Sequence, residues 1–405
     1  MLAGGFQRLG DQVRVTARVI EVESGKVLRA AKCDGGIQEI FSLQDRVVGD
    51  LVSGLRRSVS DVHEGKETKV VAAYQALAKG LLNLRNDSYE SVDRGILFFE
   101  RAVALDPSYL RAQIELGAAY SQKADYLVAP ELHRKSEVVL RRALESDPRL
   151  PRAWRELGAA LVAQARIDEG VECLQRALTL APDDPRVLAG MGRALFVGRG
   201  DFAGALAFYD RALARAPQAG WYWMQKSHCH ALLRQFEDGE PAARRAIELQ
   251  EEFLSGQQGV QLVGGYMRFA HLCALQGRFD DAAASCRQEQ AFVDGLDHAL
   301  RSRIRIELSL RLGSALVRLG DREAADASFR AGLEGFDRRV ALGADDPFTR
   351  YYAAAIHAMR GSAPEALELL ESAMRESPHF MRARAAIEPE WDDLRGDPRF
   401  QRILI

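Results

Sequence analysis

The sequence predicts a mainly α-helical protein, an α-solenoid of stacked helical hairpins, with a small α+β segment at its N-terminus. Two observations support this fold class. The landmark residues of the stretch WRELGAALVAQARIDEGVECLQRALTLAP return at a constant spacing along most of the 405-residue chain. By contrast, the stretch VRVTARVIEV near the N-terminus alternates apolar and polar residues, which is typical of a half-buried strand.

The stretch from Trp154 to Pro182 reads as two helices separated by a short break. Apolar and small residues of one face recur at helical spacing in the first half and again in the second. These residues are Trp154, Leu157, Gly158 and Leu161, then Gly170, Leu174 and Ala177. Proline cannot continue a helix, so Pro182 ends the second one. Because small residues let two helices approach closely, the stretch predicts a hairpin with a period of about 34 residues.

This period and its landmarks resemble those of tetratricopeptide repeat proteins, from about residue 73 to residue 380. The hairpin that follows Pro182 carries Leu188, Met191, Gly192 and Leu195, then Ala205, Tyr209, Ala212 and Pro217. Counted in this way, the chain holds about eight hairpins. The resemblance implies a right-handed superhelix in which each repeat buries its apolar face against its neighbours. The closing stretch EPEWDDLRGDPRFQRILI is expected to be a short helix that shields the last hairpin.

The first 65 residues differ from the repeats. Val13, Val15, Ala17 and Val19 alternate with polar residues in one strand, ESGK supplies a turn, and VLRAAKC returns as a second strand. The stretch SLQDRVVGDLVSGLRRSV then has the apolar stripe of an amphipathic helix, formed by Leu43, Val47, Leu51 and Leu55. Two strands and one helix make a poor independent domain, because an isolated hairpin is at best marginally stable.

This segment is similar to the C-terminal half of the TolB-like domain that precedes such repeats in many bacterial proteins. The resemblance rests on GDQVRVTARV, SGKVL, Cys33-Asp34 and Gln44-Asp45, and the N-terminal half of that domain is missing from the sequence. Related proteins often fuse the module to a cyclase, a kinase or a winged-helix DNA-binding domain. Either the chain begins at an internal methionine of a longer protein, or another chain completes the sheet. Since an exposed strand edge is a template for pairing, we expect the N-terminal hairpin to mediate homodimerisation or docking.

Motifs for catalysis or metal binding are weak. The stretch SGKV lacks the preceding glycine and the following Ser or Thr of a phosphate-binding loop, so it reads as a turn. The stretches SHCHALL and HLC hold histidines and cysteines, but His228 and His230 point in different directions on one helix. No full zinc ligand set is visible, and GxSxG, HExxH and GxGxxG do not occur. We therefore expect no catalytic residue, no metal and no cofactor.

The tetratricopeptide resemblance implies that the first helix of each hairpin lines the concave surface, with its second, fifth, ninth and twelfth positions facing inward. Residues mapped in this way form an arginine-rich early groove and then an apolar, aromatic patch. They are Arg111, Arg152, Arg155, Arg186 and Arg193, then Trp221, Met224, His228, Met267 and His271. Arginine binds carboxylates through a planar fork of donors, and Trp and Met supply apolar contact area. The set suits an acidic, partly apolar peptide, and a protein-binding groove without that preference stays open as the alternative.

The bulk composition narrows the possible functions and compartments. With 55 Lys and Arg against 57 Asp and Glu, the chain lacks the strongly basic balance of a nucleic-acid binder. Its five cysteines are scattered and odd in number, which favours a reduced, intracellular protein. No run of about 18 apolar residues predicts a membrane span, and the first residues lack the apolar core of a signal peptide. The cytoplasm is therefore the expected compartment.

We predict a non-enzymatic scaffold that binds a protein or peptide in its concave groove. Its parts would be a partial TolB-like segment (1–65), a tetratricopeptide superhelix (66–382) and a C-terminal capping segment (383–405). The alternative is a regulatory or sensory subunit of a bacterial signalling enzyme or transcription regulator. A metal-dependent hydrolase is a third possibility, which elemental analysis for bound metal would test.

Overall fold

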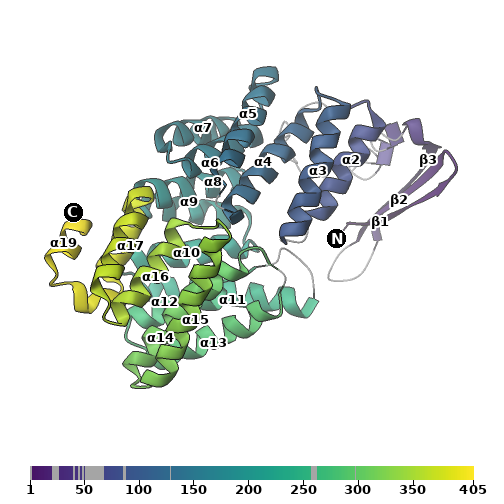
Figure 1. Ribbon diagram of the computed structural model, residues 1–405. Coiled ribbons are helices and arrows are strands. Elements are labelled where there is room, and N and C mark those ends of the chain that lie inside the picture. Colours follow the sequence, from purple (N-terminus) through teal and green to yellow (C-terminus); the bar gives the residue numbers. More distant parts are fainter. Residues whose placement is uncertain are drawn as a thin grey trace.

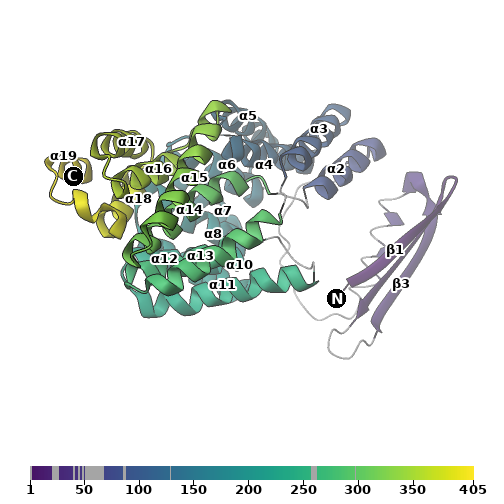
Figure 2. The ribbon, with the colours of Figure 1, turned by 60° about the horizontal axis from the view of Figure 1, so that its bottom comes forward.

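The chain forms a small N-terminal sheet followed by a long succession of helices (Figure 1). The computed structural model describes residues 2–20, 27–39, 42, 43, 46, 47, 50, 68–84, 88–127, 129–256, 262–296 and 298–405. The sheet lies at one end of the molecule, and the last helix lies at the opposite end. A turned view shows the sheet standing apart from the main body of helices (Figure 2).

The sheet has three antiparallel strands, β1 (Leu2–Leu9), β2 (Gln12–Ile20) and β3 (Val27–Gly36), in the order β1-β2-β3. The sequence predicted β2 and β3 but missed β1, whose stretch LAGGFQRL has no apolar alternation. Main-chain pairing with β2 creates this strand, and the turn between them uses Gly10 at φ +59°. The expected ESGK turn lies outside the described residues.

One face of the sheet is buried. Val13, Ala31 and Cys33 pack there with Leu43 and Val47 of the expected amphipathic helix. The remaining two residues of that helix's predicted stripe, Leu51 and Leu55, lie outside the part of the chain that the structure describes. These contacts on the buried face agree with the alternating apolar and polar residues of β2, because every second side chain of a strand points to the same face.

The helices of the described chain pair as eight successive hairpins, in agreement with the sequence count. The first four are α2 (Val71–Asn83) with α3 (Tyr89–Leu105), α4 (Leu110–Leu127) with α5 (Pro130–Ser146), α6 (Pro151–Ala163) with α7 (Ile167–Leu180), and α8 (Pro185–Arg193), prolonged by the π-helical η2 (Ala194–Arg199), with α9 (Phe202–Arg215). The last four are α10 (Gly220–Leu232) with α11 (Phe236–Gly256), α12 (Gly265–Leu275) with α13 (Phe279–Asp294), α14 (Arg301–Arg318) with α15 (Arg322–Ala341), and α16 (Pro347–Met359) with α17 (Ala363–Glu376).

The α6–α7 hairpin closes through small residues, as the spacing of its landmarks predicted. In the α6–α7 pair, a Cβ added to Gly158 would lie 2.8 Å from the carbonyl oxygen of Gly170. A Cβ added to Gly170 would lie equally close to the carbonyl oxygen of Gly158. The two backbones therefore meet where neither position has room for a side chain, since a real Cβ does not approach an oxygen so closely.

A repeated hydrogen bond fixes three of the hairpins to the one before them. The indole of Trp154 donates to the carbonyl of Pro148, and the indole of Trp223 donates to the carbonyl of Pro217, both at 2.8 Å. Gln113 makes the same contact with Pro107 in an earlier hairpin, at 2.6 Å. The landmark tryptophans of the sequence thus share one structural role, which is to tie the start of a hairpin to the end of the previous helix.

The C-terminal residues fold back over the repeats in place of the expected single short helix. They form α18 (Pro378–Ile387), the 3-10 helix η3 (Pro389–Leu394) and α19 (Pro398–Leu404). The short α19 packs against α17, whereas η3 packs against α16 and α18 reaches η2 and α10. One hydrophobic cluster therefore unites the fourth hairpin with the C-terminus. The predicted boundary at residue 382 lies within α18, and the three-part division stays a prediction.

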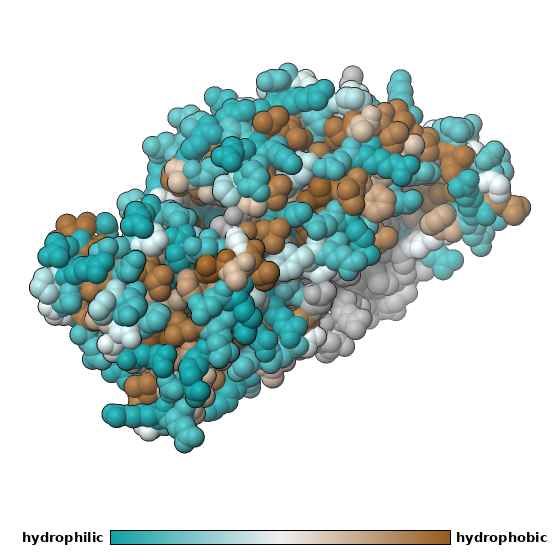
Figure 3. All heavy atoms as spheres, viewed as in Figure 1, coloured by the Kyte–Doolittle hydropathy of each residue, from teal (hydrophilic) through white to brown (hydrophobic). Residues whose placement is uncertain are grey.

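A second contact brings distant parts of the chain together. Ala299, which precedes α14, is buried in the hydrophobic cluster formed by α2, α3 and α4. Hydrophilic side chains cover most of the face shown in Figure 3, with hydrophobic ones between them. Several exposed apolar side chains belong to the first two hairpins, among them Leu82, Leu97 and Val138.

Candidate functional site

The ten groove residues predicted from the repeat pattern lie on α4, α6, α8, α10 and α12, and they fall into two groups. Four of them are buried. These are Met224, His228, Met267 and His271. The other six keep some contact with solvent. These are Arg111, Arg152, Arg155, Arg186, Arg193 and Trp221.

The buried group is covered by the protein itself. Met224 packs with Ala246 and Leu262, and Met267 lies in another apolar cluster. The His228 ring lies 5.0 Å from Phe196 and 5.5 Å from Phe380, measured between ring centroids. Because Phe380 belongs to α18, the C-terminal segment occupies the middle of the inner surface. A partner can therefore reach His228 only if that segment moves. Met224 and Met267 are covered by neighbouring repeats instead.

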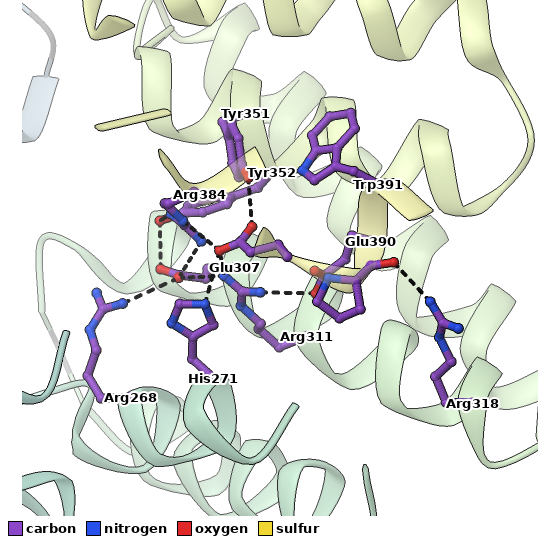
Figure 4. Close-up of polar contacts among 12 residues, drawn as sticks. Arg268, His271, Glu307, Arg311, Arg318, Tyr351, Tyr352, Arg384, Glu390 and Trp391 are labelled. Carbon is purple, nitrogen blue, oxygen red and sulfur yellow. Dashed lines mark hydrogen bonds and ion pairs between the residues drawn. The ribbon is translucent and has the colours of Figure 1, made fainter. Parts of the chain in front are cut away.

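A buried polar network holds the C-terminal segment in place (Figure 4). Arg311 of α14 donates to Glu388 at 2.7 Å and to Glu390 at 3.0 Å. Glu388 also accepts hydrogen bonds from Arg384 and from the hydroxyl of Tyr351, both at 2.7 Å. We call Glu388, Glu390, Arg311, Arg384, Tyr351, His271, Tyr352 and Glu307 the C-terminal clamp.

The clamp extends across α12, α14 and α16. His271 Nε2 lies 3.1 Å from Glu388 Oε1, and the hydroxyl of Tyr352 donates to Glu307 at 2.7 Å. Arg384 lies 3.4 Å from Glu307, so α18 is joined to α14 as well as to η3. The first helices of three successive hairpins thus hold one acidic stretch of the same chain, in the place where the resemblance expected a partner.

Burial and the charges of the clamp lower the pKa values of some of its residues and raise those of others. Burial opposes ionisation of Glu388 and Glu307, but the neighbouring arginines outweigh it and lower both pKa values, that of Glu307 to about 2. Glu390 has a raised pKa because it is buried, and Glu388 nearby adds to that effect. Burial and the cation Arg311 lower the pKa of His271 to about 4. His271 is therefore neutral near pH 7, while Glu388 and Glu307 carry the charges that the arginines balance.

The solvent-accessible group is partly neutralised by acidic neighbours that the repeat pattern did not select. Arg152 binds Glu115 through two hydrogen bonds of 2.6 and 2.7 Å, and Arg155 is paired with Glu156. These bidentate and adjacent pairs use up much of the donor capacity of two predicted arginines. The arginine ladder is thus less available to a partner than the sequence alone suggested.

Arg186, Arg193 and Trp221 keep the largest accessible surface of this group. Arg186 is exposed, and within the described chain its side chain has no ion pair or hydrogen bond. Arg193 is 51% exposed and lies 3.5 Å from Asp125. Trp221 is 37% exposed, as predicted for an outward-facing residue, and its edge meets Tyr209 at 6.0 Å between centroids.

Three charged residues near this surface were missed by the repeat pattern. They are Asp125, Arg268 and Arg303. Asp125 lies near the end of α4 and Arg303 near the start of α14, and both helices have 18 residues against 13 in α6. The two residues therefore lie on helical turns that a standard repeat does not have. The sequence signal that could have revealed these two residues is the unusual length of the apolar pattern in their hairpins.

The described part of the chain contains no group of three or more His, Cys, Asp or Glu side chains placed to hold a metal ion. None of its helices is both long and apolar enough to cross a membrane. All five cysteines are buried and unpaired.

Family models describe part of the chain as repeats. A tetratricopeptide repeat model matches residues 122–185 and 156–220, and a second model of that name matches residues 306–334. These segments cover α5 to α9, most of α14 and the larger part of α15. The resemblance of residues 1–65 to a TolB-like domain stays a prediction.

Two curated proteins are similar to this chain over part of its length. The BBSome complex member BBS4 of Bos taurus is 25% identical over 240 residues, which are 58% of this chain and 42% of that protein. Putative adenylate cyclase 3 of Rhizobium meliloti (strain 1021) is 24% identical over 178 residues, 42% of this chain and 30% of that protein. The chain thus spans less than half the length of either relative.

Two solved structures align with this chain at low similarity. Yeast Tom70 aligns with a TM-score of 0.47 and 16% identity, over 85% of this chain and 69% of its own. A tetratricopeptide repeat protein from Parabacteroides merdae ATCC 43184 aligns with a TM-score of 0.46 and 12% identity, over 74% of this chain and 98% of its own. The family-model matches and the eight hairpins show that this chain is an α-solenoid that contains tetratricopeptide repeats.

Proposed function

We propose that the protein is a non-enzymatic scaffold that binds a segment of another protein on the N-terminal half of its concave surface. Tetratricopeptide solenoids commonly act as protein-interaction scaffolds, because stacking creates an extended curved surface. The proposed binding residues are Arg111, Arg152, Arg155, Arg186, Arg193 and Trp221. Acidic and aromatic or apolar groups of the partner would match the guanidinium and indole side chains of this set.

One observation supports confining the site to this half. The C-terminal segment fills the inner surface at α10, α12, α14 and α16, and its clamp is fully buried. Arg186, Arg193 and Trp221 keep their access to solvent. A partner that binds here needs no rearrangement of the fold, which favours pre-organised association.

Site-specific photo-crosslinking in the native cell tests the proposal. A benzoylphenylalanine replaces Arg186 on the inner surface, and in a matched control it replaces Arg142, an exposed residue of α5 on the outer helix layer. We expect one protein to be crosslinked from position 186 and not from position 142. Equal crosslinking from both positions, or none from position 186, would remove the support for a concave binding site.

A second candidate function is suggested by the similarity to a putative adenylate cyclase of Rhizobium meliloti. In that case the chain would be a regulatory or sensory part of a signalling enzyme, with the N-terminal sheet as the sensor. Mapping the 5′ end of the transcript separates the two candidates. A catalytic domain encoded in frame upstream would favour the signalling role, and its absence would favour the scaffold.

We also propose that the N-terminal sheet can pair with a second copy of the chain. In the described sheet, β1 is an edge strand that pairs only with β2, and Phe6 and Leu9 on it are 75% and 86% exposed. Such an edge has unpaired main-chain groups and no proline or bulge to protect it.

The cytoplasm remains the proposed compartment, which the unpaired cysteines favour.

A further inference from the structure

The second helices of the fifth and sixth hairpins, α11 and α13, run side by side in the outer helix layer and are bridged at two levels (Figures 1 and 2). Near their starts, Arg278 at the N-cap of α13 lies 3.0 Å from Glu240 of α11. Further along, Gln250 of α11 donates to Glu289 of α13 at 3.3 Å. The two bridges fix the spacing of these helices, and the side chains between the bridges decide how well the gap is filled.

Between the two bridges, the helices leave a cavity of about 260 Å³. Phe269 of α12 and Ile247 of α11 give it an apolar lining. The facing stretch of α13, DDAAASC, consists mostly of short side chains, and α13 presents only Ser285 and Gln288 to the cavity. A cavity of roughly 150 Å³ is enough to hold benzene, so this one has room for a substituted single ring.

The charged side chains at the cavity already have partners within the chain. Arg244 donates to Glu240 at 2.6 Å, and Glu248 accepts a hydrogen bond from Arg245 at 2.6 Å. By contrast, Ser285 is only 5% exposed, and its hydroxyl makes no hydrogen bond within the part of the chain that the structure describes. A buried hydroxyl without a partner has a desolvation cost, which a hydrogen bond to a ligand would offset.

The position of Arg244 favours a flat ligand. Its guanidinium lies over the ring of Phe269, 4.6 Å from the centroid, and its edge is bound to Glu240. The Arg244 side chain is still 59% exposed, so the face turned away from Phe269 is the part left free. Because a guanidinium stacks on aromatic faces, this surface suits a planar ring better than a branched aliphatic group.

We propose that this cavity binds a small, uncharged aromatic alcohol of the phenol class, with its ring against Arg244 and Ile247 and its hydroxyl bonded to Ser285. An uncharged ligand fits because both charged side chains at the cavity have partners. A free molecule fits better than a peptide, because the two bridges close the gap at both ends and an extended segment could not continue along it. The site belongs to the outer layer, so it and the proposed concave site are independent of each other.

The test uses the whole 405-residue chain and 4-methylphenol, with affinity measured by a saturation-transfer NMR titration. A Kd on the order of 1 mM is expected for so small a ligand. Toluene has the same ring without the hydroxyl, and it should bind the wild type about fivefold more weakly. Ser285→Ala should weaken 4-methylphenol by the same factor, about fivefold, and leave the affinity for toluene unchanged, because toluene makes no hydrogen bond to lose.

A second variant fills the cavity. Ser285→Leu should weaken binding of both ligands at least about tenfold, because the larger side chain occupies the space of the ring. The matched control is Ser146→Leu, at an exposed position of the outer helix α5, which should leave both affinities unchanged. Thermal melts followed by circular dichroism confirm that each variant folds, and Ser285→Ala alone decides the matter if Ser285→Leu does not fold.

The inference is overturned if 4-methylphenol shows no saturable binding, or if a folded Ser285→Leu binds it as tightly as the wild type. It is also overturned if toluene binds as tightly as 4-methylphenol, since the Ser285 hydroxyl would then play no part. Tighter binding of benzoate than of 4-methylphenol would refute the uncharged class of ligand. Tighter binding of N-acetyltyrosinamide would refute the free molecule and indicate a tyrosine side chain of a partner instead.

Discussion

Removing the Arg311 side chain should release the C-terminal segment from the solenoid. Arg311 is 2% exposed and supplies the direct ion pairs to both Glu388 and Glu390. In Arg311→Met, a side chain of similar length and apolar character replaces it, so packing changes little while the charge is lost. Glu390 then faces Glu388 with no cation bound to it, and Glu388 keeps only Arg384.

The expected cost follows from burial. Breaking a buried ion pair by removing one partner costs about 3–5 kcal/mol, because the remaining charge stays desolvated. The matched control is Arg318→Met on the same helix, since Arg318 binds Asp392 of η3 at 2.8 Å with side chains 35% and 43% exposed. An exposed pair of this kind contributes about 0–1 kcal/mol. Arg318 also donates to the carbonyl of Pro389 at 2.9 Å, so both arginines bind the C-terminal segment and burial is the main difference between them.

Amide hydrogen exchange measures the effect where it occurs, because a solenoid can unfold locally and a single melting curve mixes its parts. Protection of the α18 and η3 amides should fall by about 100-fold or more in Arg311→Met, at tenfold for every 1.4 kcal/mol. In Arg318→Met it should fall less than about fivefold. Similar, small losses in both variants would refute the view that the buried charges of the clamp hold the segment.

Three further outcomes are expected. Lowering the pH from 6.5 to 4 should destabilise the protein, because His271 has a pKa lowered to about 4 and the unfolded chain takes up that proton first; a further loss should follow between pH 4.5 and 2 as Glu307 is protonated. Urea titrations at several pH values check this, and His271→Gln should flatten only the upper window. Gly158→Leu should cost at least about 1–3 kcal/mol, since a Cβ there already meets the Gly170 carbonyl and Leu174, whereas Gly396→Ala, in open space, should be neutral within about 0.5 kcal/mol in the same titration. Light scattering should find a dimer that becomes a monomer on deletion of residues 1–65; a monomer in both cases would exclude pairing through β1.

The repeat architecture was predictable because its signal is periodic. Gly158, Gly170 and the tryptophans at 154 and 223 each satisfy a local requirement of the hairpin, so their spacing shows in the sequence. Strand β1 was not predictable, since its pairing with β2 depends on main-chain hydrogen bonds and its Gly4-Gly5 pair hides the alternation. Local pattern reveals an element only when side chains, rather than backbone partners, stabilise it.

The site was predictable only in part, for a physical reason. The repeat pattern correctly predicts that Trp221 is exposed, but it treats the concave surface as empty. The burial of His228 and His271 depends on α18 and η3, which are more than 100 residues away in sequence. A local repeat pattern contains no information about such long-range contacts. Likewise Arg303 belongs to an extra turn of α14, so a position count within a standard repeat cannot select it.

The chain places its own carboxylates on inner-surface arginines at two sites, and burial decides which site can exchange. Glu388 is fully buried, so removing it from Arg311 would leave desolvated charges on both sides and cost several kcal/mol, about 3–5. Asp125 is 36% exposed, so water compensates its release, and an incoming carboxylate restores the ion pair to Arg193. We therefore expect the Arg311–Glu388 pair to stay formed, whereas Arg193 can exchange Asp125 for another carboxylate. A carboxylate that competes for these arginines is therefore expected to displace Asp125 from Arg193 at a lower cost than Glu388 from Arg311.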